Sequence, residues 1–302
     1  MGSWTLDDIP WDRFDRDRLD PEIVRIIKAA SLVEYNGGAY AHHLCRIFDD
    51  DPDFQQTARR WGEEEIQHGK ALARWSVLAD PGFDFKAAFT RFQAGYQVDF
   101  NLDVSRRGSR SGEMIARCIV EVATSSYYTA LREAAREPVL QEICRNIAAD
   151  EFRHYKLFYK NLTHCLERER IGFWRRLRVA VRRIAESEDD ELAYAYYAAN
   201  ETERSYDRDY FRRAYARRAY ALCREHHVAH GMTMIFKAVG LTSNGVLARA
   251  ATRLAWRFMR TRALRLANAL PPKPYARSFR SSAACARIEC NRRVSGVGAQ
   301  LV

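Results

Sequence analysis

Two Glu-x-x-His motifs, each preceded by a lone glutamate, are the residues of this 302-residue chain best suited to chemistry. The lone glutamate lies 31 residues before the first motif and 30 residues before the second. The doubled set consists of Glu34, Glu65, His68, Glu121, Glu151 and His154. Residues three apart share one side of a helix, so each motif offers a carboxylate and an imidazole to a single point. Oxygen-rich ligation with two imidazoles suits iron or manganese better than zinc.

The charge of this set also favours a pair of metal ions. Four carboxylates carry four negative charges, which two divalent ions would neutralise, whereas burying the carboxylates alone would be very costly. The alternative is that these are ordinary surface carboxylates with two incidental histidines. Apolar neighbours such as Ile27, Ile119 and Ile147 crowd three of the four sites and argue against that alternative. We therefore predict a buried site for two metal ions.

The spacing of the set predicts the elements that position it. The midpoint between Glu34 and Glu65 falls at Asp49-Asp50, in an acid-rich turn. The midpoint between Glu121 and Glu151 falls at Arg136, beside a Glu-Pro pair. In a helix hairpin, residues equidistant from the turn lie at the same height. The 56 residues from Glu65 to Glu121 are too many for a tight loop. The predicted fold is all-α and resembles a ferritin-like four-helix bundle with one long crossover, followed by a C-terminal helical extension.

Proline, glycine and capping residues divide the chain further. Helices that carry the ligand set are predicted at about 21–47, 52–79, 113–136 and 138–167. Other helices are predicted at about 84–104 (the crossover), 173–186, 189–238 and 245–268. The predicted organisation is an N-terminal arm (1–20), the two-metal bundle (21–168), additional helices that become basic toward their end (169–270), and a flexible basic tail (271–302).

The cysteines and the hydropathy pattern predict a cytoplasmic protein. Seven cysteines at irregular spacings, without a Cys-x-x-Cys motif, favour a reducing compartment. They also exclude a fused rubredoxin-type centre, so electrons for the metals must come from another protein. No uncharged apolar run approaches the roughly 20 residues that span a bilayer, and no signal peptide opens the chain. Peripheral association with a membrane is compatible with these features.

The net charge of +10 belongs to the C-terminal extension. Residues 244–302 hold twelve Lys or Arg against one acid and carry +11, which leaves −1 on residues 1–243. Four arginines repeat there at helical spacing, namely Arg249, Arg253, Arg257 and Arg260. This segment suits an acyl-carrier protein, an anionic membrane surface or an acidic electron donor. The alternative is a solvated face that aids solubility, and no nucleic-acid-binding module accompanies the charge.

Three segments around the ligand positions resemble the soluble acyl-carrier-protein desaturases. Trp61–Gly69 looks like their Trp-x-x-Glu-Glu-x-x-His-Gly segment, and Ile147–His154 is similar to their Ala-Asp-Glu-x-Arg-His segment. Glu121 and Thr124 match their third-helix Glu-x-x-Thr. The resemblance covers about residues 25–165. It implies two iron ions (Fe2+/Fe3+) held by the doubled set, with Thr124 as a catalytic residue beside them near the oxygen site.

The predicted function is an O₂-dependent di-iron oxidoreductase, desaturase- or hydroxylase-like, that acts on a hydrophobic, acyl substrate. Thr124 would help to deliver protons, and a ferredoxin-like donor would supply electrons. Manganese at one or both sites and a homodimer are both compatible with the sequence. The alternatives are a peroxidase or radical-generating oxidase of the same fold, and a non-enzymatic iron-handling protein.

Small residues follow each lone glutamate by one helical turn. They are Gly37-Gly38 in the first half and Thr124-Ser125 in the second. Glycine in a helix interior costs about 1 kcal/mol relative to alanine, so two in a row need a reason. One interpretation is close contact between helices. The other is free volume beside the metals for oxygen and a substrate chain, which a simple iron store would not need.

Two further groups of residues have a functional and a structural interpretation. Glu225, His226, His227 and His230 have ligand-like spacing, but a partly exposed helix face is the favoured interpretation. Five tyrosines lie near the ligands and include a candidate radical site, although aromatic residues on bundle helices more often form core. They are Tyr35, Tyr40, Tyr127, Tyr128 and Tyr155.

Overall fold

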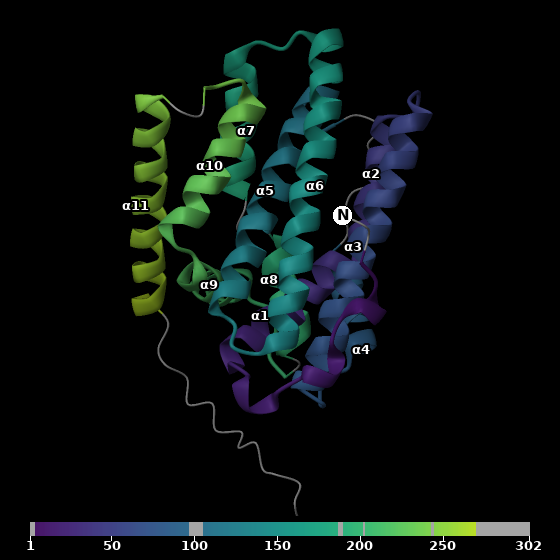
Figure 1. The fold of residues 1–302 in the computed structure, drawn as a ribbon, viewed down its shortest axis with the longest axis vertical. Coiled ribbons are helices and arrows are strands. Elements are labelled where there is room, and N and C mark those ends of the chain that lie inside the picture. The colour runs from purple at the N-terminus through teal and green to yellow at the C-terminus, as the bar shows by residue number, and fades with distance from the viewer. Residues whose placement is uncertain (1–3, 97–104, 187–189, 202, 243–244, 270–302) are drawn as a thin grey trace, which may run out of the picture. The chain divides into compact units, whose positions relative to one another are not determined.

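The computed structural model describes residues 4–96, 105–186, 190–201, 203–242 and 245–269 (Figure 1). Within these ranges the chain is helical and contains no β-strand, which confirms the predicted all-α class. The described residues up to Ala269 belong to one compact unit. The predicted tail and the second half of the predicted crossover helix lie outside the described residues.

Four helices carry the ligand set. They are α1 (Pro21–Tyr35), α3 (Pro52–Ala79), α5 (Arg110–Ala134) and α6 (Pro138–Glu169). The turns before α3 and α6 lie where the spacing predicted them, because both helices begin with a capped proline. The Asp51 carboxylate accepts a hydrogen bond from the Phe54 amide, and the Glu137 carboxylate accepts from the amides of Val139 and Leu140. α3 packs beside α1, α6 packs beside α5, and contact between α3 and α6 joins the two pairs (Figure 1).

The first helix is interrupted directly after its ligand. The prediction of one continuous helix to about residue 47 is wrong, because α1 ends at Tyr35 and α2 (Gly37–Ile47) begins after Asn36. The Asn36 amide bonds to the carbonyls of Leu32 and Val33, which tightens the last turn of α1. The chain can bend there and still follow α3, against which both α1 and α2 pack.

The glycines near this break permit close contact between helices. A Cβ on Gly37 would lie 2.9 Å from Cγ of Glu65 and closer still to its Cβ. A Cβ on Gly69 would lie 2.6 Å from Cα of Tyr35. Both distances are below those that real Cβ atoms show, so α3 approaches α1 and α2 more closely than alanine would allow. Of the two interpretations of Gly37, the structure supports helix contact.

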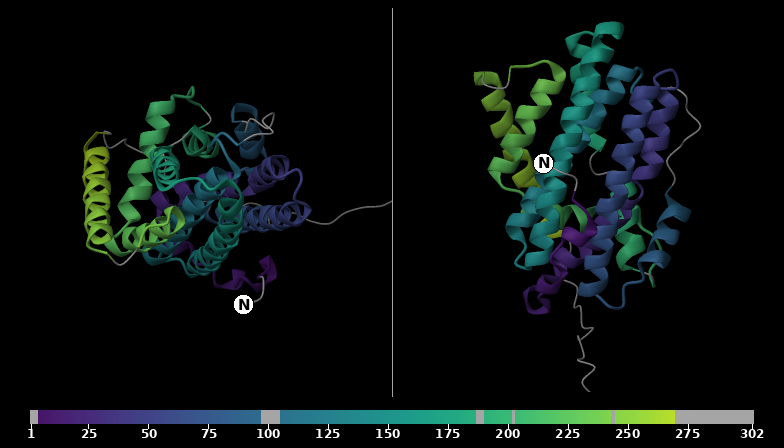
Figure 2. Two further views of the ribbon diagram at one scale, coloured as in Figure 1. Left: turned by 90° about the horizontal axis from the view of Figure 1, so that it is seen from above. Right: turned by 45° about the vertical axis from the view of Figure 1, so that its right-hand side comes forward.

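In the crossover and the C-terminal part, the helices predicted at 173–186 and 245–268 have nearly the predicted bounds, whereas the others are shorter than predicted. The helices of these parts are α4 (Phe85–Gly95), α7 (Phe173–Ala185), α8 (Asp190–Asn200), α9 (Arg208–Leu222), α10 (Glu225–Val239) and α11 (Val246–Ala269). The single helix predicted over 189–238 is wrong, because Asp207 caps a new helix through the Tyr210 amide and Cys223 and Arg224 are extended. The separate helices pack on different partners, α8 on α1 and α10 on α5. As Figure 2 shows, α10 and α11 lie on the opposite side of the bundle from α2 and α3.

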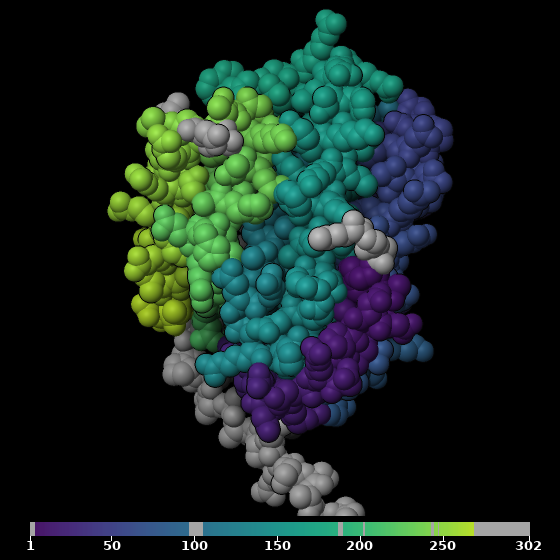
Figure 3. Space-filling view, in the orientation of Figure 1, coloured from purple at the N-terminus to yellow at the C-terminus, as the bar shows by residue number. Residues whose placement is uncertain are grey.

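The N-terminal arm forms three short 3-10 helices rather than an extended segment. They are η1 (Leu6–Asp8), η2 (Trp11–Arg13) and η3 (Arg16–Arg18). η1 contacts α3 and η2 contacts α6, and Figure 3 shows the arm lying on the outside of the bundle beside α6. Among the described residues, no helix is both long enough and apolar enough to cross a membrane.

Candidate metal centre

The six residues of the doubled set lie together inside the bundle as two overlapping groups. One group is Glu34, Glu65, His68 and Glu151, and the other is Glu65, Glu121, Glu151 and His154. In each group the donor atoms lie within 4.8 Å of one another. All six residues are buried, and none is more than 7 % exposed. Glu65 and Glu151 belong to both groups, so each could contribute to either metal position.

The two histidines face the carboxylates through the same ring nitrogen. Nδ1 of His68 lies 3.3 Å from Glu151 Oε1 and 3.7 Å from Glu34 Oε2. Nδ1 of His154 lies 3.0 Å from Glu65 Oε1 and 3.5 Å from Glu121 Oε2. Two ligand atoms bound to one ion at about 2.1 Å lie roughly 3–4 Å apart. The observed separations therefore match ligands that surround a common ion.

The donor atoms that face the centre lack other partners. Among the buried side-chain atoms without a hydrogen-bond partner are Glu65 Oε1, His68 Nδ1, Glu121 Oε1, Glu151 Oε1 and His154 Nδ1. Buried polar atoms are normally satisfied, and an unpaired cluster calls for an ion or a comparable group. Together with four carboxylates and two imidazoles, this cluster fits a pair of divalent iron or manganese ions.

Each histidine is held from behind by an acid on the opposite helix. Nε2 of His68 lies 3.1 Å from Asp150 Oδ2, and Nε2 of His154 lies 2.8 Å from Glu64 Oε2. An Nε2–H that donates to a carboxylate leaves the lone pair on Nδ1, the atom that faces the centre. Acids in this position orient metal-bound histidines and raise their basicity.

Arg153 and Trp4 complete the surroundings of these acids. The Arg153 guanidinium donates to Glu64 Oε2 at 2.8 Å and also to Asp150, so it links the two acids. Trp4 Nε1 donates to Asp150 Oδ2 at 2.7 Å, and the Trp4 carbonyl accepts from Gln67 at 2.7 Å. The N-terminal arm therefore fixes one of the two acids from outside the bundle.

Two hydroxyl groups contact the ligand carboxylates. The Tyr128 hydroxyl donates to Glu34 Oε1 at 2.5 Å and is fully buried. Thr124 Oγ lies 2.8 Å from Glu151 Oε2 and also within reach of the carbonyls of Val120 and Glu121. Because a threonine hydroxyl has a single proton, it bonds either to its own helix or to Glu151 at a given moment.

Crowding shifts the pKa values of these groups in opposite directions. Burial raises the pKa of Glu121 to about 7, and burial together with the charges of Glu151 and Glu34 raises the pKa of Glu65. Burial also acts on Glu151, but the adjacent imidazoles of His154 and His68 outweigh it and lower the Glu151 pKa. Burial favours neutral imidazoles, yet the surrounding carboxylates raise the pKa of both histidines. The negative charge of the buried carboxylates therefore has to be compensated by protons or by metal ions.

The structure brings together all seven residues that the sequence singled out, Thr124 included. The sequence prediction did not include Glu64, Asp150, Arg153 and Trp4 as residues that support the ligands. A signal was present for two of them, because Glu64 and Asp150 each directly precede a ligand glutamate. Each of these two acids contacts the histidine of the other helix. This pairing depends on how α3 and α6 face each other, which spacing along one helix does not show.

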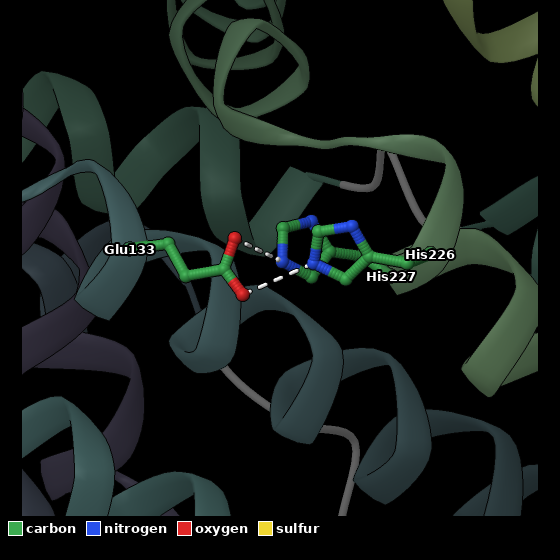
Figure 4. A group of neighbouring side chains, drawn as sticks. All are labelled: Glu133, His226 and His227. Carbon is green, nitrogen blue, oxygen red and sulfur yellow. Dashed lines mark hydrogen bonds and ion pairs between the residues drawn. The ribbon is translucent and has the colours of Figure 1, made fainter.

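A second cluster contains His226 and His227, and its acid is not the neighbouring Glu225. Glu133 from α5 faces both rings from one side, with His226 Nε2 3.0 Å from Oε1 and His227 Nε2 3.3 Å from Oε2 (Figure 4). His230 instead faces the ring of Phe152. The i,i+4 pair His226 and His230 therefore does not form a common site, as the favoured interpretation of a partly exposed helix face implies.

Hydrogen bonding at His227 explains this second cluster without a metal. The Arg224 amide donates to His227 Nδ1 at 3.0 Å, so in the neutral ring the hydrogen is on Nε2, which lies 3.3 Å from Glu133 Oε2. Coordination through Nε2 would require that hydrogen to leave and the capping bond to break. A histidine–glutamate contact that ties α10 to α5 is the simpler account.

One open pocket of about 1070 Å³ lies at an end of the bundle, away from the candidate centre. Residues of the α2–α3 turn, the start of α5 and the end of α6 line it, among them Phe48, Arg110 and Lys160. None of the six residues of the doubled set lines this pocket. It therefore does not supply the free volume beside the metals that one interpretation of the small residues required.

Comparison with known proteins points to one family. The fatty acid desaturase family model matches residues 41–183 of this chain. The matched segment contains five of the six residues of the doubled set, and only Glu34 precedes it. No curated protein matches the chain. Over this segment, the chain is similar to fatty acid desaturases.

Proposed function

We propose that this protein is an O₂-dependent di-iron oxidoreductase that desaturates or hydroxylates a hydrophobic, acyl-type substrate. The observation that carries the proposal is the pair of overlapping buried groups that share Glu65 and Glu151. The match to fatty acid desaturases supports the reaction class and the choice of iron over manganese. An acyl chain is the substrate class that this similarity favours.

The residues around the centre have separable tasks in this proposal. Glu34 and His68 would hold one ion, Glu121 and His154 the other, and the two shared glutamates would hold both. When bound and reduced, the iron pair would supply the activation of O₂. Asp150 and Glu64 fix the histidine rings, so their Nδ1 atoms stay directed at the ions.

Thr124 is the residue best placed to handle a proton at the centre. Its hydroxyl contacts Glu151 Oε2 and can turn to a backbone carbonyl of its own helix. A proton that reaches the hydroxyl can therefore pass to this carboxylate oxygen over one hydrogen bond. Replacing Thr124 by valine would keep the side-chain shape and remove this route.

The proposal also includes partners and a compartment. Because the sequence contains no Cys-x-x-Cys motif, electrons would come from a separate, ferredoxin-like donor. An acyl-carrier protein is one candidate for delivering the substrate. Five cysteines in the described part of the chain are free thiols, which suits the reducing environment of a cytoplasm.

The test begins with iron content. Protein loaded anaerobically with Fe2+ should hold two irons per chain, and Glu121→Gln should lower that number. Glu113→Gln is the matched control, because Glu113 is a buried glutamate on the same helix that bonds to Ser105 instead. Equal iron loss in both variants, or one iron or none in the unsubstituted protein, would refute the site.

The second step of the test concerns the reaction. The di-ferrous protein should consume O₂ and convert an acyl substrate in the presence of a reducing system, with product detected by mass spectrometry. If acyl thioesters and free fatty acids all remain unchanged while ferric iron accumulates, the protein handles iron and the oxidoreductase proposal fails.

One observation favours a second candidate function, a radical-generating oxidase. The buried Tyr128 hydroxyl donates to the ligand Glu34, so a one-electron oxidation at the centre could extend to this ring. The expected signature is a tyrosyl radical in electron paramagnetic resonance after O₂ is added, absent in Tyr128→Phe. Substrate turnover that persists in Tyr128→Phe, with no radical in the parent protein, would exclude this function.

A further inference from the structure

The outward face of α11 carries large apolar side chains. Leu254 is 67 % exposed and Phe258 is 70 % exposed, and Val246 and Leu264 are also exposed. With 100° per residue, these four positions fall within one third of the helix circumference. The opposite side of α11 faces the protein, where Ala248 and Leu266 are buried and the helix packs on α9 and α10. Within the part of the chain that the structure describes, the apolar row is therefore not used for packing.

Arginines follow the apolar row along the same outward face. The exposed members are Arg249, Arg253, Arg257, Arg260 and Arg265. The first four occupy the arc of the helix beside Val246, and Arg265 falls between Leu254 and Phe258, so cationic and apolar side chains project in neighbouring directions. α11 contains six arginines and no aspartate or glutamate, so nothing in the helix itself balances this charge.

A similar combination occurs on α7, which also packs on α10. Trp174 is 78 % exposed and Val181 is exposed beside it, two turns further along the helix. Arg178 lies between them on the same face, and Arg175 and Arg182 flank it. Tryptophan and arginine with apolar side chains are typical of helices that lie in a membrane–water interface.

The chemistry of this face selects among three possible occupants. A second copy related by two-fold symmetry would bring the same arginine row against itself, which like charges oppose. An acidic protein would satisfy the charge but would also need concave pockets for Phe258 and Leu254. An anionic lipid surface suits both the arginines and the apolar row. Its phosphate groups bind the arginines, while the apolar side chains enter the boundary between headgroups and acyl chains. The row also extends along a helix of about 36 Å, at 1.5 Å per residue, as a convex ridge that suits a plane.

We propose that the outward face of α11 binds anionic lipid surfaces, with Leu254 and Phe258 inserted and Arg249, Arg253, Arg257 and Arg260 on the lipid phosphates. This interaction is independent of the metal centre and of its proposed chemistry. It would hold the protein at a membrane surface without a spanning helix. Binding should fall with added salt, because contacts with the lipid charge are screened over about 8 Å at physiological ionic strength.

The experiment measures co-sedimentation of the full-length protein with two kinds of vesicle. One is phosphatidylcholine alone, and the other contains about one third phosphatidylglycerol. Binding is expected only to the second. Each basic side chain near an anionic surface contributes about fivefold to binding, so Arg253→Gln/Arg257→Gln should weaken it about 30-fold. Leu254→Ser/Phe258→Ser should weaken it by at least about tenfold, although the charge is unchanged.

Matched substitutions elsewhere control for charge and exposure. Arg60→Gln/Arg136→Gln removes two exposed arginines from other helices or turns, and Val77→Ser removes an exposed apolar side chain from α3. These variants should bind as the parent does. Circular dichroism and thermal unfolding check that all variants fold. Because the substituted side chains are exposed, the helicity and Tm of the variants should match those of the parent.

Four outcomes would overturn the proposal. Vesicle binding that both α11 variants retain would place the lipid contact elsewhere in the chain. Absence of vesicle binding, with Phe258-dependent binding to acyl-carrier protein, would assign the face to an acidic protein. Absence of vesicle binding, with self-association that Leu254→Ser/Phe258→Ser abolishes in analytical ultracentrifugation, would assign it to a second copy. Failure to bind any of the three would leave α11 a solvated face and refute the proposal as well.

Discussion

Gly37→Ala should damage the metal centre, although it adds only one methyl group. Gly37 has no positive φ, so its backbone conformation is open to alanine. The new Cβ would lie 2.9 Å from Cγ of Glu65 and closer still to Cβ, which the backbone of α3 fixes in place. Either α2 or α3 must therefore shift, and Glu65 is shared by both ligand groups.

Gly38→Ala is the matched control. A Cβ at Gly38 would meet Cδ1 of Ile66 at 3.1 Å, and this is the end of a flexible side chain. Both substitutions replace glycine by alanine in the same helix, which by itself favours the folded state by up to about 1 kcal/mol. The comparison between neighbouring positions therefore isolates the contact with Glu65.

The magnitude follows from the contact. Overpacking a tight interior costs about 1–3 kcal/mol, so Gly37→Ala should be about 2 kcal/mol less stable than Gly38→Ala. For a chain of this size, that difference lowers Tm by about 3 °C. Gly37→Ala should also hold less iron after anaerobic loading. Thermal unfolding and iron analysis of the two variants test both expectations.

A null result in this comparison would refute the reasoning. If Gly37→Ala and Gly38→Ala have equal Tm and equal iron content, helix contact does not explain Gly37. The space beside Glu65 would then accommodate a methyl group, and the alternative of free volume next to the metals would regain support. Reduced O₂ consumption in Gly37→Ala with full iron content would also support the alternative of free volume beside the metals.

Three further predictions concern the ligands, their supports and a thiol. His154→Ala should lose most bound iron while circular dichroism shows nearly unchanged helicity, since packing elsewhere supports the bundle; global loss of helicity would contradict this. Asp150→Asn should weaken iron binding by about 10–100-fold, because it weakens the partner of His68, and unchanged affinity in a competition titration would exclude that role. Burial raises the pKa of Cys165 to about 11, so its thiolate is scarce at neutral pH and its alkylation should become faster up to about pH 11. Alkylation at pH 8 as fast as that of a free cysteine would refute this expectation.

The clustering of the six candidate ligands could be predicted from the sequence because it depends on local geometry. Residues three apart face one way on any helix, and capped prolines at Pro52 and Pro138 fix where the helices begin. Because the turn lies midway between the two glutamates of each pair, these glutamates are placed at the same height. None of these steps depends on how side chains from distant segments pack.

Features that depend on packing between helices were missed. The break at Asn36 serves the contact with α3, and the helices between residues 190 and 239 separate because each packs on a different neighbour. His226 and His227 pair with Glu133, which lies 93 residues earlier in the sequence than His226. Spacing along a single helix contains no information about such a partner.

The acids that precede the ligand glutamates show how a short motif can specify more than its ligands. Glu64 lies next to the ligand Glu65 on α3 but bonds to His154 of α6, while Asp150 lies next to the ligand Glu151 on α6 but bonds to His68 of α3. Each acid thus orients the histidine of the other helix, and Arg153 ties the two acids together. Either motif alone would leave its histidine free to rotate. Only when both helices are in place are both Nδ1 atoms directed at the centre, so the rigidity of the site is a property of the pair of motifs and requires the folded bundle.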